Sequence, residues 1–162
     1  MKFEINLDAT DLWRFSMYHV NRGLQGIFNL LFTAAAVLCL IFARDQLSGG
    51  YIALLVVCAL AFCVWQPLLL YLKSRKQAKT AGIRETLRME FGEELVTVSQ
   101  ADQVQELPWD RIVKLIRTKH MVIIYTDRIH AYLLPVSVVG ERMEEFAALV
   151  RKHLPKERWK GL

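Results

Sequence analysis

Two long stretches without a charged residue constrain this chain more than any other feature of its sequence. They run over residues 26–43 and 51–72. As α-helices they would be roughly 27 and 33 Å long, which suits a bilayer hydrocarbon core of about 30 Å. Inside lipid every main-chain polar group needs an internal hydrogen-bond partner, and a helix provides one. The sequence therefore predicts a transmembrane hairpin over residues 26–72.

Two other interpretations compete with this one. In the first, the two stretches are buried helices of a soluble core. However, too little polar sequence remains in a chain of 162 residues to cover two fully apolar helices. In the second, the first stretch is a cleaved signal peptide. However, residues 1–25 contain three acidic residues, and no small-x-small cleavage site follows the apolar stretch. The pattern favours two retained spans.

Lysine and arginine beside the two stretches predict the orientation of the hairpin, because these residues are retained on the cytoplasmic side. The short connection 44–50 contains Arg44, and the segment before the first span contains Arg14 and Arg22. Four of the five net positive charges lie in the connector 73–82, on Lys73, Arg75, Lys76 and Lys79. Both termini are therefore expected in the cytoplasm, with the protein in the cell membrane.

The same four basic residues have a second interpretation, as membrane-surface contacts to anionic headgroups at about 1 kcal/mol each. A nucleic-acid-binding domain would instead spread its basic residues over a folded face. Membrane lipid is therefore an expected partner of this chain, and nucleic acid is not.

Beyond residue 83 the hydrophobic period changes to two, which is typical of half-buried strands. Turns of a few residues separate the runs and predict an antiparallel meander. The predicted strands are 87–91, 95–99, 103–107, 112–117, 121–125 and 129–134.

An amphipathic helix ends the predicted domain. Met143, Phe146 and Val150 fall on one helical stripe, and this helix is expected to cap one opening of the curved sheet. At the N-terminus, residues 3–7 alternate like an edge strand, and a helix is expected from about Asp11 to Gln25. Because both ends of the chain are predicted in the cytoplasm, the 3–7 strand can reach the meander and complete it.

These predictions divide the chain into four parts. They are an N-terminal strand with an interfacial helix at 1–25, the hairpin at 26–72, the basic connector at 73–82 and the cytoplasmic domain at 83–162. The predicted fold class is a membrane α-helical hairpin plus an α+β domain. In that domain six or seven strands form an antiparallel meander or barrel, like that of pleckstrin-homology (PH) domains, capped by the C-terminal helix.

Several short motifs accompany this layout. They are Trp109-Asp-Arg-Ile-Val-Lys, Ile123-Ile-Tyr125, Tyr132-Leu-Leu-Pro135 and Gly140-Glu-Arg-Met-Glu-Glu-Phe. With the two spans and the basic connector they resemble the YcxB-like family of bacterial membrane proteins over nearly the whole chain. The resemblance implies two spans and a PH-like C-terminal domain. It implies no reaction, because the family has no established biochemical activity.

No arrangement of side chains in the sequence is typical of catalysis. The four histidines lie on separate predicted elements and lack ligand spacing: His19, His120, His130 and His153. No nucleophile elbow and no glycine-rich phosphate loop is present in the sequence. The three cysteines lie inside the apolar stretches, where a thiol behaves as a small hydrophobe. We therefore expect no enzymatic activity, no metal and no cofactor.

Three residues of the predicted cytoplasmic domain are candidate contacts for an anion or a partner. Trp109, beside Pro108, is either a core ring or a partner contact. Arg117 and Lys119 frame a predicted turn that is either simply solvated or contacts a phosphate.

The sequence predicts a membrane-anchored, non-enzymatic interaction or regulatory module at the inner face of the bacterial cytoplasmic membrane. A protein partner, unidentified, would dock on a sheet edge or on the rim of the barrel, for example by strand addition. One alternative is an accessory subunit of a transporter or cell-envelope complex that acts through the spans. The other is a sensor of anionic lipid in the inner leaflet, using Arg117 and Lys119.

Overall fold

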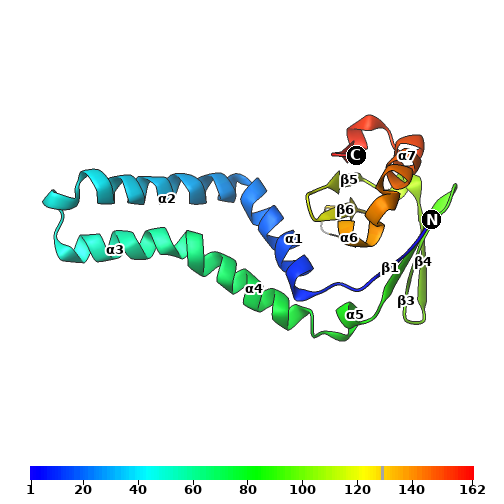
Figure 1. The fold of residues 1–162 in the computed structure, drawn as a ribbon, viewed down its shortest axis with the longest axis horizontal. Helices are drawn as coiled ribbons and strands as arrows, with labels where there is room; N and C mark the ends of the chain where they lie inside the picture. Colours follow the sequence, from blue (N-terminus) through cyan, green and yellow to red (C-terminus); the bar gives the residue numbers. More distant parts are fainter. Residues whose placement is uncertain (129) are drawn as a thin grey trace. The chain divides into compact units, whose positions relative to one another are not determined.

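The computed structural model of the protein describes residues 1–128 and 130–162. Contacts divide the chain into two compact units (Figure 1). The helical unit is Leu12–Gln77, and the β unit combines Met1–Asp11 with Ala78–Leu162. Each unit is described separately below.

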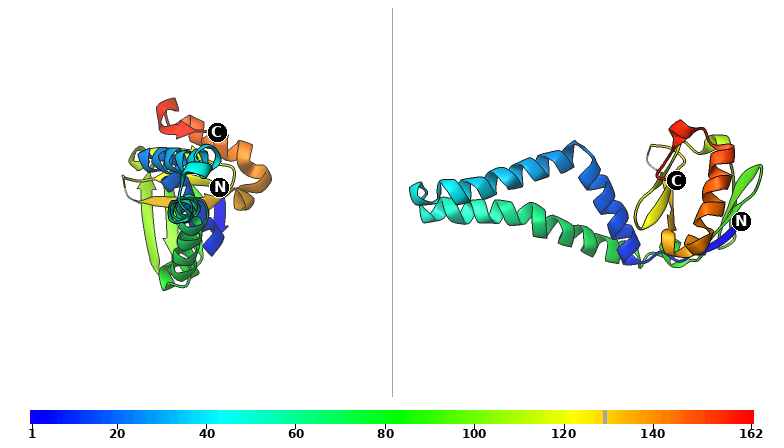
Figure 2. Two further views of the ribbon diagram at one scale, coloured as in Figure 1. Left: turned by 90° about the vertical axis from the view of Figure 1, so that its left-hand side faces the viewer. Right: turned by 45° about the horizontal axis from the view of Figure 1, so that its top comes forward.

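The helical unit is built around an antiparallel pair of apolar helices, α2 and α3 (Figures 1 and 2). A short 3-10 turn at Arg44–Gln46 joins them. The helices that contribute to this unit are α1 (Ala9–Arg22), α2 (Leu24–Phe42), α3 (Gly49–Leu60), a π-helical turn (Ala61–Trp65) and α4 (Gln66–Gln77).

Two continuous helical segments, Leu24–Phe42 and Gly49–Gln77, are long and apolar enough to cross a membrane by length and composition. The protein itself buries little of them: 6% of the most apolar window in the first and 0% in the second. Large side chains such as Phe28 (75% exposed) face outward. In this respect the two segments differ from the core helix of a soluble protein, which is mostly buried.

The helix boundaries differ from the predicted ones by a few residues: α1 starts at Ala9, α2 spans Leu24–Phe42 and not 26–43, and the second apolar segment starts at Gly49 and not at residue 51. The predicted helix 11–25 ends at Arg22, because the chain breaks at Gly23 before α2 begins. A Cβ at Gly26 would lie 2.3 Å from the carbonyl oxygen of Asn21, so glycine is required where the first turn of α2 approaches the end of α1 so closely. At the other end, α4 continues to Gln77 and contains the first part of the basic connector.

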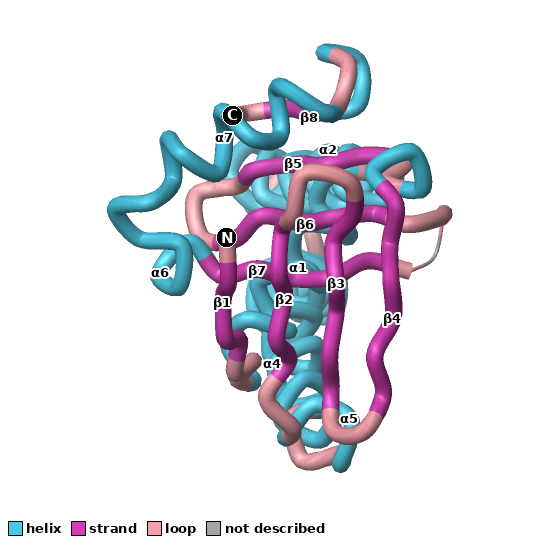
Figure 3. Tube along the Cα trace, turned by 90° about the vertical axis from the view of Figure 1, so that its right-hand side faces the viewer, coloured by secondary structure: helices cyan, strands magenta, loops and turns pink. Residues whose placement is uncertain are grey.

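The β unit contains two four-stranded sheets whose strands run in crossing directions (Figure 3). The strand order is β1-β2-β3-β4 in the first and β7-β6-β5-β8 in the second. The first sheet consists of β1 (Lys2–Ile5), β2 (Leu87–Phe91), β3 (Leu95–Gln100) and β4 (Gln103–Pro108). The second consists of β5 (Lys114–Arg117), β6 (Met121–Tyr125), β7 (Ala131–Pro135) and β8 (Trp159–Lys160).

Apart from α7, the helices of the β unit are short. They are α5 (Ala81–Arg84), 3-10 turns at Trp109–Arg111, Gly140–Arg142 and Lys156–Arg158, α6 (Val136–Val139) and α7 (Met143–His153).

The α+β class is confirmed, but the prediction of a single antiparallel meander or barrel was wrong: the described strands form two separate sheets, and β8 pairs with β5 in parallel. The chain leaves the first sheet after Pro108 and turns through the 3-10 segment Trp109–Arg111 before β5 begins. The predicted strand 112–117 accordingly starts at Lys114. The predicted strand 129–134 starts at Ile129, which lies outside the described residues, and β7 covers its remainder from Ala131.

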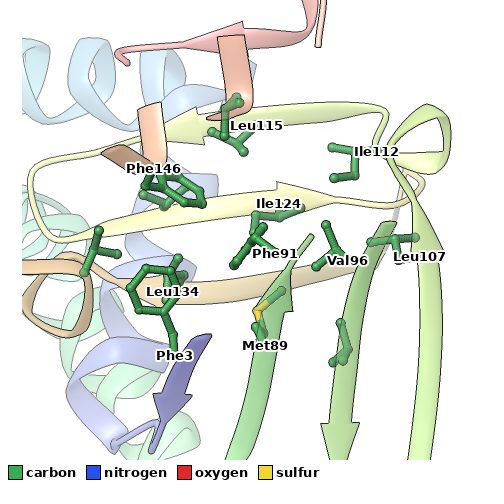
Figure 4. Close-up of a cluster of buried hydrophobic side chains, with 14 of the residues drawn as sticks. Phe3, Met89, Phe91, Val96, Leu107, Ile112, Leu115, Ile124, Leu134 and Phe146 are labelled. Atoms are coloured by element: carbon green, nitrogen blue, oxygen red, sulfur yellow. The ribbon is translucent and has the colours of Figure 1, made fainter. Parts of the chain in front are cut away.

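The N-terminal strand completes the first sheet, as the alternation at residues 3–7 predicts, although it covers Lys2–Ile5. β1 pairs antiparallel with β2, and Phe3 lies opposite Met89 although residues 6–86 separate the strands. The core between the two sheets and α7 contains Phe3, Phe91 and Phe146, which point toward one another (Figure 4). The rings of Phe91 and Phe146 meet edge to face at 5.0 Å, a favoured geometry for aromatic pairs.

Candidate functional site

Strand β4 lies at one edge of the first sheet and is the most exposed strand of the β unit. Its pattern of exposure is unusual because, among its six residues, Leu107 alone is buried. In its sheet the hydrogen-bonded neighbour of β4 is β3. At the opposite edge α6 packs against β1. An edge strand offers main-chain donors and acceptors to another chain.

The hairpin that joins β3 to β4 determines which main-chain groups face outward. Ala101 and Asp102 form a two-residue connection, so Gln100 and Gln103 make a hydrogen-bonded pair. Ala101 has a φ of 49°, as the first residue of such a connection requires. Hydrogen-bonded and non-hydrogen-bonded pairs then alternate along the ladder. The alternation turns the main-chain groups of Val104 and Glu106 away from β3.

Pro108 is an independent check on this register. It lies opposite Leu95, two positions beyond the Thr97–Glu106 pair. Its main-chain groups therefore also point away from β3. Proline lacks an N–H and is tolerated in a sheet where no ladder bond is needed. The outward edge of β4 therefore presents N–H and C=O groups at Val104 and Glu106 and a carbonyl alone at Pro108.

The side chains beside this edge are mixed in character. Val104 is 67% exposed and lies opposite Ser99, while Glu106 lies opposite Thr97. The Tyr132 hydroxyl of β7 donates a hydrogen bond of 2.7 Å to the Gln105 side chain. Partial burial raises the pKa of the Tyr132 phenol above its ordinary value of 10.0, so the hydroxyl remains a donor at neutral pH. This bond ties β4 to the second sheet.

Val104 and Gln105 are not among the residues that the sequence predicts to be functional. One signal was available: the run Gln103–Glu106 contains a single apolar residue, whereas β6 is apolar over Met121–Ile124. A strand with so few apolar residues is typical of a sheet edge.

The predicted basic residues fall into both units. Lys73, Arg75 and Lys76 are exposed on α4 in the helical unit, and Lys79 is exposed in the turn that follows within the β unit. Arg117 is half-buried at the end of β5, and Lys119 is exposed in the next turn. Thr118 holds that turn, because its hydroxyl donates to the Met121 carbonyl at 2.8 Å.

Trp109 is a core residue with 5% of its surface exposed. Its indole N–H donates to the carbonyl of Gly92 at 3.2 Å, and its ring stacks on His153 at 4.8 Å with an interplanar angle of 11°. This burial favours the core interpretation of Trp109 over a direct contact with a partner.

Glu93 lies beside this stacked pair at the surface. Its carboxylate is 3.4 Å from Nε2 of His153 and forms an ion pair with Lys152. The hydrogen bond and charge of Lys152 hold the pKa of Glu93 below 4.5. Among residues 1–128 and 130–162, no three His, Cys, Asp or Glu side chains are grouped as metal ligands.

Comparison with known proteins gave one match. Residues 91–150 match the model of the YcxB-like protein family. The match confirms the resemblance over the segment that runs from the end of β2 to α7, and it includes β4. Neither a curated protein nor a solved structure matches the chain.

Proposed function

We propose that this YcxB-like chain is a membrane-anchored, non-enzymatic interaction module that binds an extended segment of a partner protein along β4. The proposal depends on one observation: the main-chain N–H and C=O groups of Val104 and Glu106 point away from β3 on an exposed edge strand. An added strand would pair with the two N–H and C=O sets there, and its side chains would provide specificity.

The chemistry of the edge indicates what kind of segment it suits. A residue of the partner opposite Val104 would be apolar or β-branched, because such pairs stabilise neighbouring strands. A residue opposite Glu106 would be basic or carry a hydroxyl, since like charges facing each other are destabilising. The missing N–H of Pro108 limits the added strand to a short contact centred on Val104 and Glu106.

The helical unit supplies the proposed anchor. Its apolar helices would lie in the cytoplasmic membrane, with Lys73, Arg75 and Lys76 at the inner surface and both termini in the cytoplasm. The exposed apolar surface of α2 and α3 supports this placement, because lipid would cover it. The antiparallel runs β1-β2-β3-β4 and β5-β6-β7, with α7 against the core between them, support assignment of the β unit to a PH-like layout.

A photocrosslinking experiment tests the proposal in membranes of cells that express the full chain. p-Benzoylphenylalanine replaces Val104 in one protein and Glu144, exposed on α7, in a matched control. The Val104 position should crosslink to a defined partner and the Glu144 position should not. Equal crosslinking at both positions, or a Val104 product that contains a second copy of this chain, would overturn the proposal.

Proline substitution tests whether partner binding needs the outward N–H of residue 104, while the β3–β4 pairing is kept. Val104→Pro removes an outward N–H without removing a β3–β4 ladder bond, so the domain should remain folded while the partner is lost. Val104→Thr keeps both the N–H and the β-branched shape and should retain the partner. Retention of the partner by Val104→Pro would exclude strand addition at this edge.

A further inference from the structure

A cavity inside the helical unit combines polar and apolar side chains, and strand addition on β4 does not use it. It has a volume of about 180 Å³ and lies among α1, α2, the π-helical turn and α4. Its walls are apolar at residues such as Leu30. Four of its lining residues carry hydrogen-bonding side chains: Asn21, Asn29, Thr33 and Gln66.

Two of these side chains join the helices across the hairpin. Nδ2 of Asn29 on α2 donates a hydrogen bond of 2.8 Å to Oε1 of Gln66 on α4. A primary amide has two donor positions and two acceptor positions, and this bond uses one on each residue. Amides placed in a lipid-facing hairpin are costly, so they are typical of a site that receives a polar group.

The π-helical turn Ala61–Trp65 borders the cavity and has an irregular main-chain hydrogen-bond pattern. Gln66 donates its N–H to the carbonyl of Ala61, five residues back. The next donor in that register would be Pro67, which has no N–H to offer the carbonyl of Phe62. Phe62 and Pro67 both line the cavity. The irregular backbone and the amide pair therefore meet at one place, as is frequent for π-turns at functional sites.

We propose that this cavity binds the glycerol-ester region of one phospholipid molecule. Gln66 precedes Lys73 on the continuous helix α4 by about 10 Å. A phosphate at Lys73 would thus place its ester groups near the depth of Gln66 and Asn29, with acyl chains along the apolar walls. The polar lining is neutral, which suits an ester carbonyl better than a bare anion. The inference rests on the membrane anchoring proposed above and is independent of β4.

Native mass spectrometry of the full chain in detergent tests the inference with dioleoyl phosphatidylglycerol as the probe. The wild type should retain one lipid molecule, and the double variant Asn29→Leu/Gln66→Leu should bind it about tenfold more weakly. Gln46→Leu, at an exposed position in the turn between α2 and α3, is the matched control and should bind like the wild type. Dioleoylglycerol should compete, whereas inorganic phosphate should not. Equal binding by the double variant, or competition by phosphate alone, would overturn the inference.

Cys63 provides a second readout that leaves the cavity residues intact. It is exposed and lines the cavity, so a bound lipid should cover it. In the Cys39→Ala/Cys58→Ala protein, dioleoyl phosphatidylglycerol should slow alkylation of Cys63 by N-ethylmaleimide about tenfold. An unchanged rate would contradict the inference. Carbonate extraction distinguishes the two levels of failure: a chain that stays in the membrane but binds no lipid refutes the lipid site alone, and a released chain refutes the anchoring.

Discussion

Replacing Phe3 by alanine tests whether the N-terminal strand is a structural part of the β unit. Phe3 is 5% exposed, and its ring meets those of Phe91 and Phe146 edge to face at 5.9 and 6.2 Å. The guanidinium of Arg142 lies over the Phe3 ring, 5.4 Å from its centre. A substitution there removes core volume and these aromatic contacts together.

The expected cost follows from that burial. Phe→Ala in a core destabilises by about 3–5 kcal/mol, because the lost transfer free energy adds to the cavity left behind. Domains are typically stable by about 5–15 kcal/mol, so Phe3→Ala should remove a large part of the stability of the β unit. The loss corresponds to a Tm lower by at least about 12 °C.

Hydrogen exchange of the full chain in detergent measures the loss of stability of the β unit separately from that of the helices. Amides of β2 and β3 should exchange at least about a hundredfold faster in Phe3→Ala, at 1.4 kcal/mol for each factor of ten. Lys2→Ala is the matched control, because its exposed ion pair with Glu90 at 3.0 Å contributes less than about 1 kcal/mol. Wild-type exchange rates in Phe3→Ala would refute the assignment of β1 to this sheet.

Three further predictions concern the β unit. Ala101→Gly should raise its free energy of unfolding by about 0.5–1 kcal/mol, because glycine adopts the φ of 49° without strain, and Ala101→Val should lower it; thermal unfolding checks both. Trp109→Phe keeps an aromatic ring but removes the donor to Gly92, and should cost about 1–2 kcal/mol in urea unfolding. The lowered pKa of Glu93 means that its carboxylate stabilises the fold above the unfolded pKa of 4.5, and this contribution is lost as the pH falls through the folded value. Glu93→Gln should therefore unfold at a lower temperature than the wild type at pH 7, and the difference should disappear well below pH 4.5.

The elements that local pattern controls could be predicted from the sequence. β2 lies at the period-two run Leu87–Phe91 and β6 at the β-branched run Met121–Tyr125, because alternation and β-branching are local properties. Helix α7 likewise buries Met143, Phe146 and Val150, the residues of the predicted stripe. The two apolar helices also follow from composition alone.

The features that distant contacts control could not be predicted in the same way. The pairing of Leu115 with Trp159 in a parallel arrangement depends on the chain that follows α7, and nothing in the two-residue strand β8 indicates it. The division into two sheets depends on the 3-10 turn Trp109–Arg111, after which β5 pairs with β6 and β8 and not with β4. The polar run Gln103–Glu106 is typical of an edge strand, but the order of strands in the sheet, which decides which strand lies at its edge, depends on distant pairing.

Cysteine labelling in intact cells tests most directly whether the chain spans the membrane twice with its β unit inside. In a protein whose Cys39, Cys58 and Cys63 are replaced by alanine, single cysteines are introduced at Ser48 in the hairpin turn and at Glu144 on α7, both exposed positions. A membrane-impermeant maleimide should label Ser48→Cys in intact cells and Glu144→Cys after the cells are opened. Labelling of Glu144→Cys in intact cells, or recovery of the protein in the soluble fraction, would contradict the account.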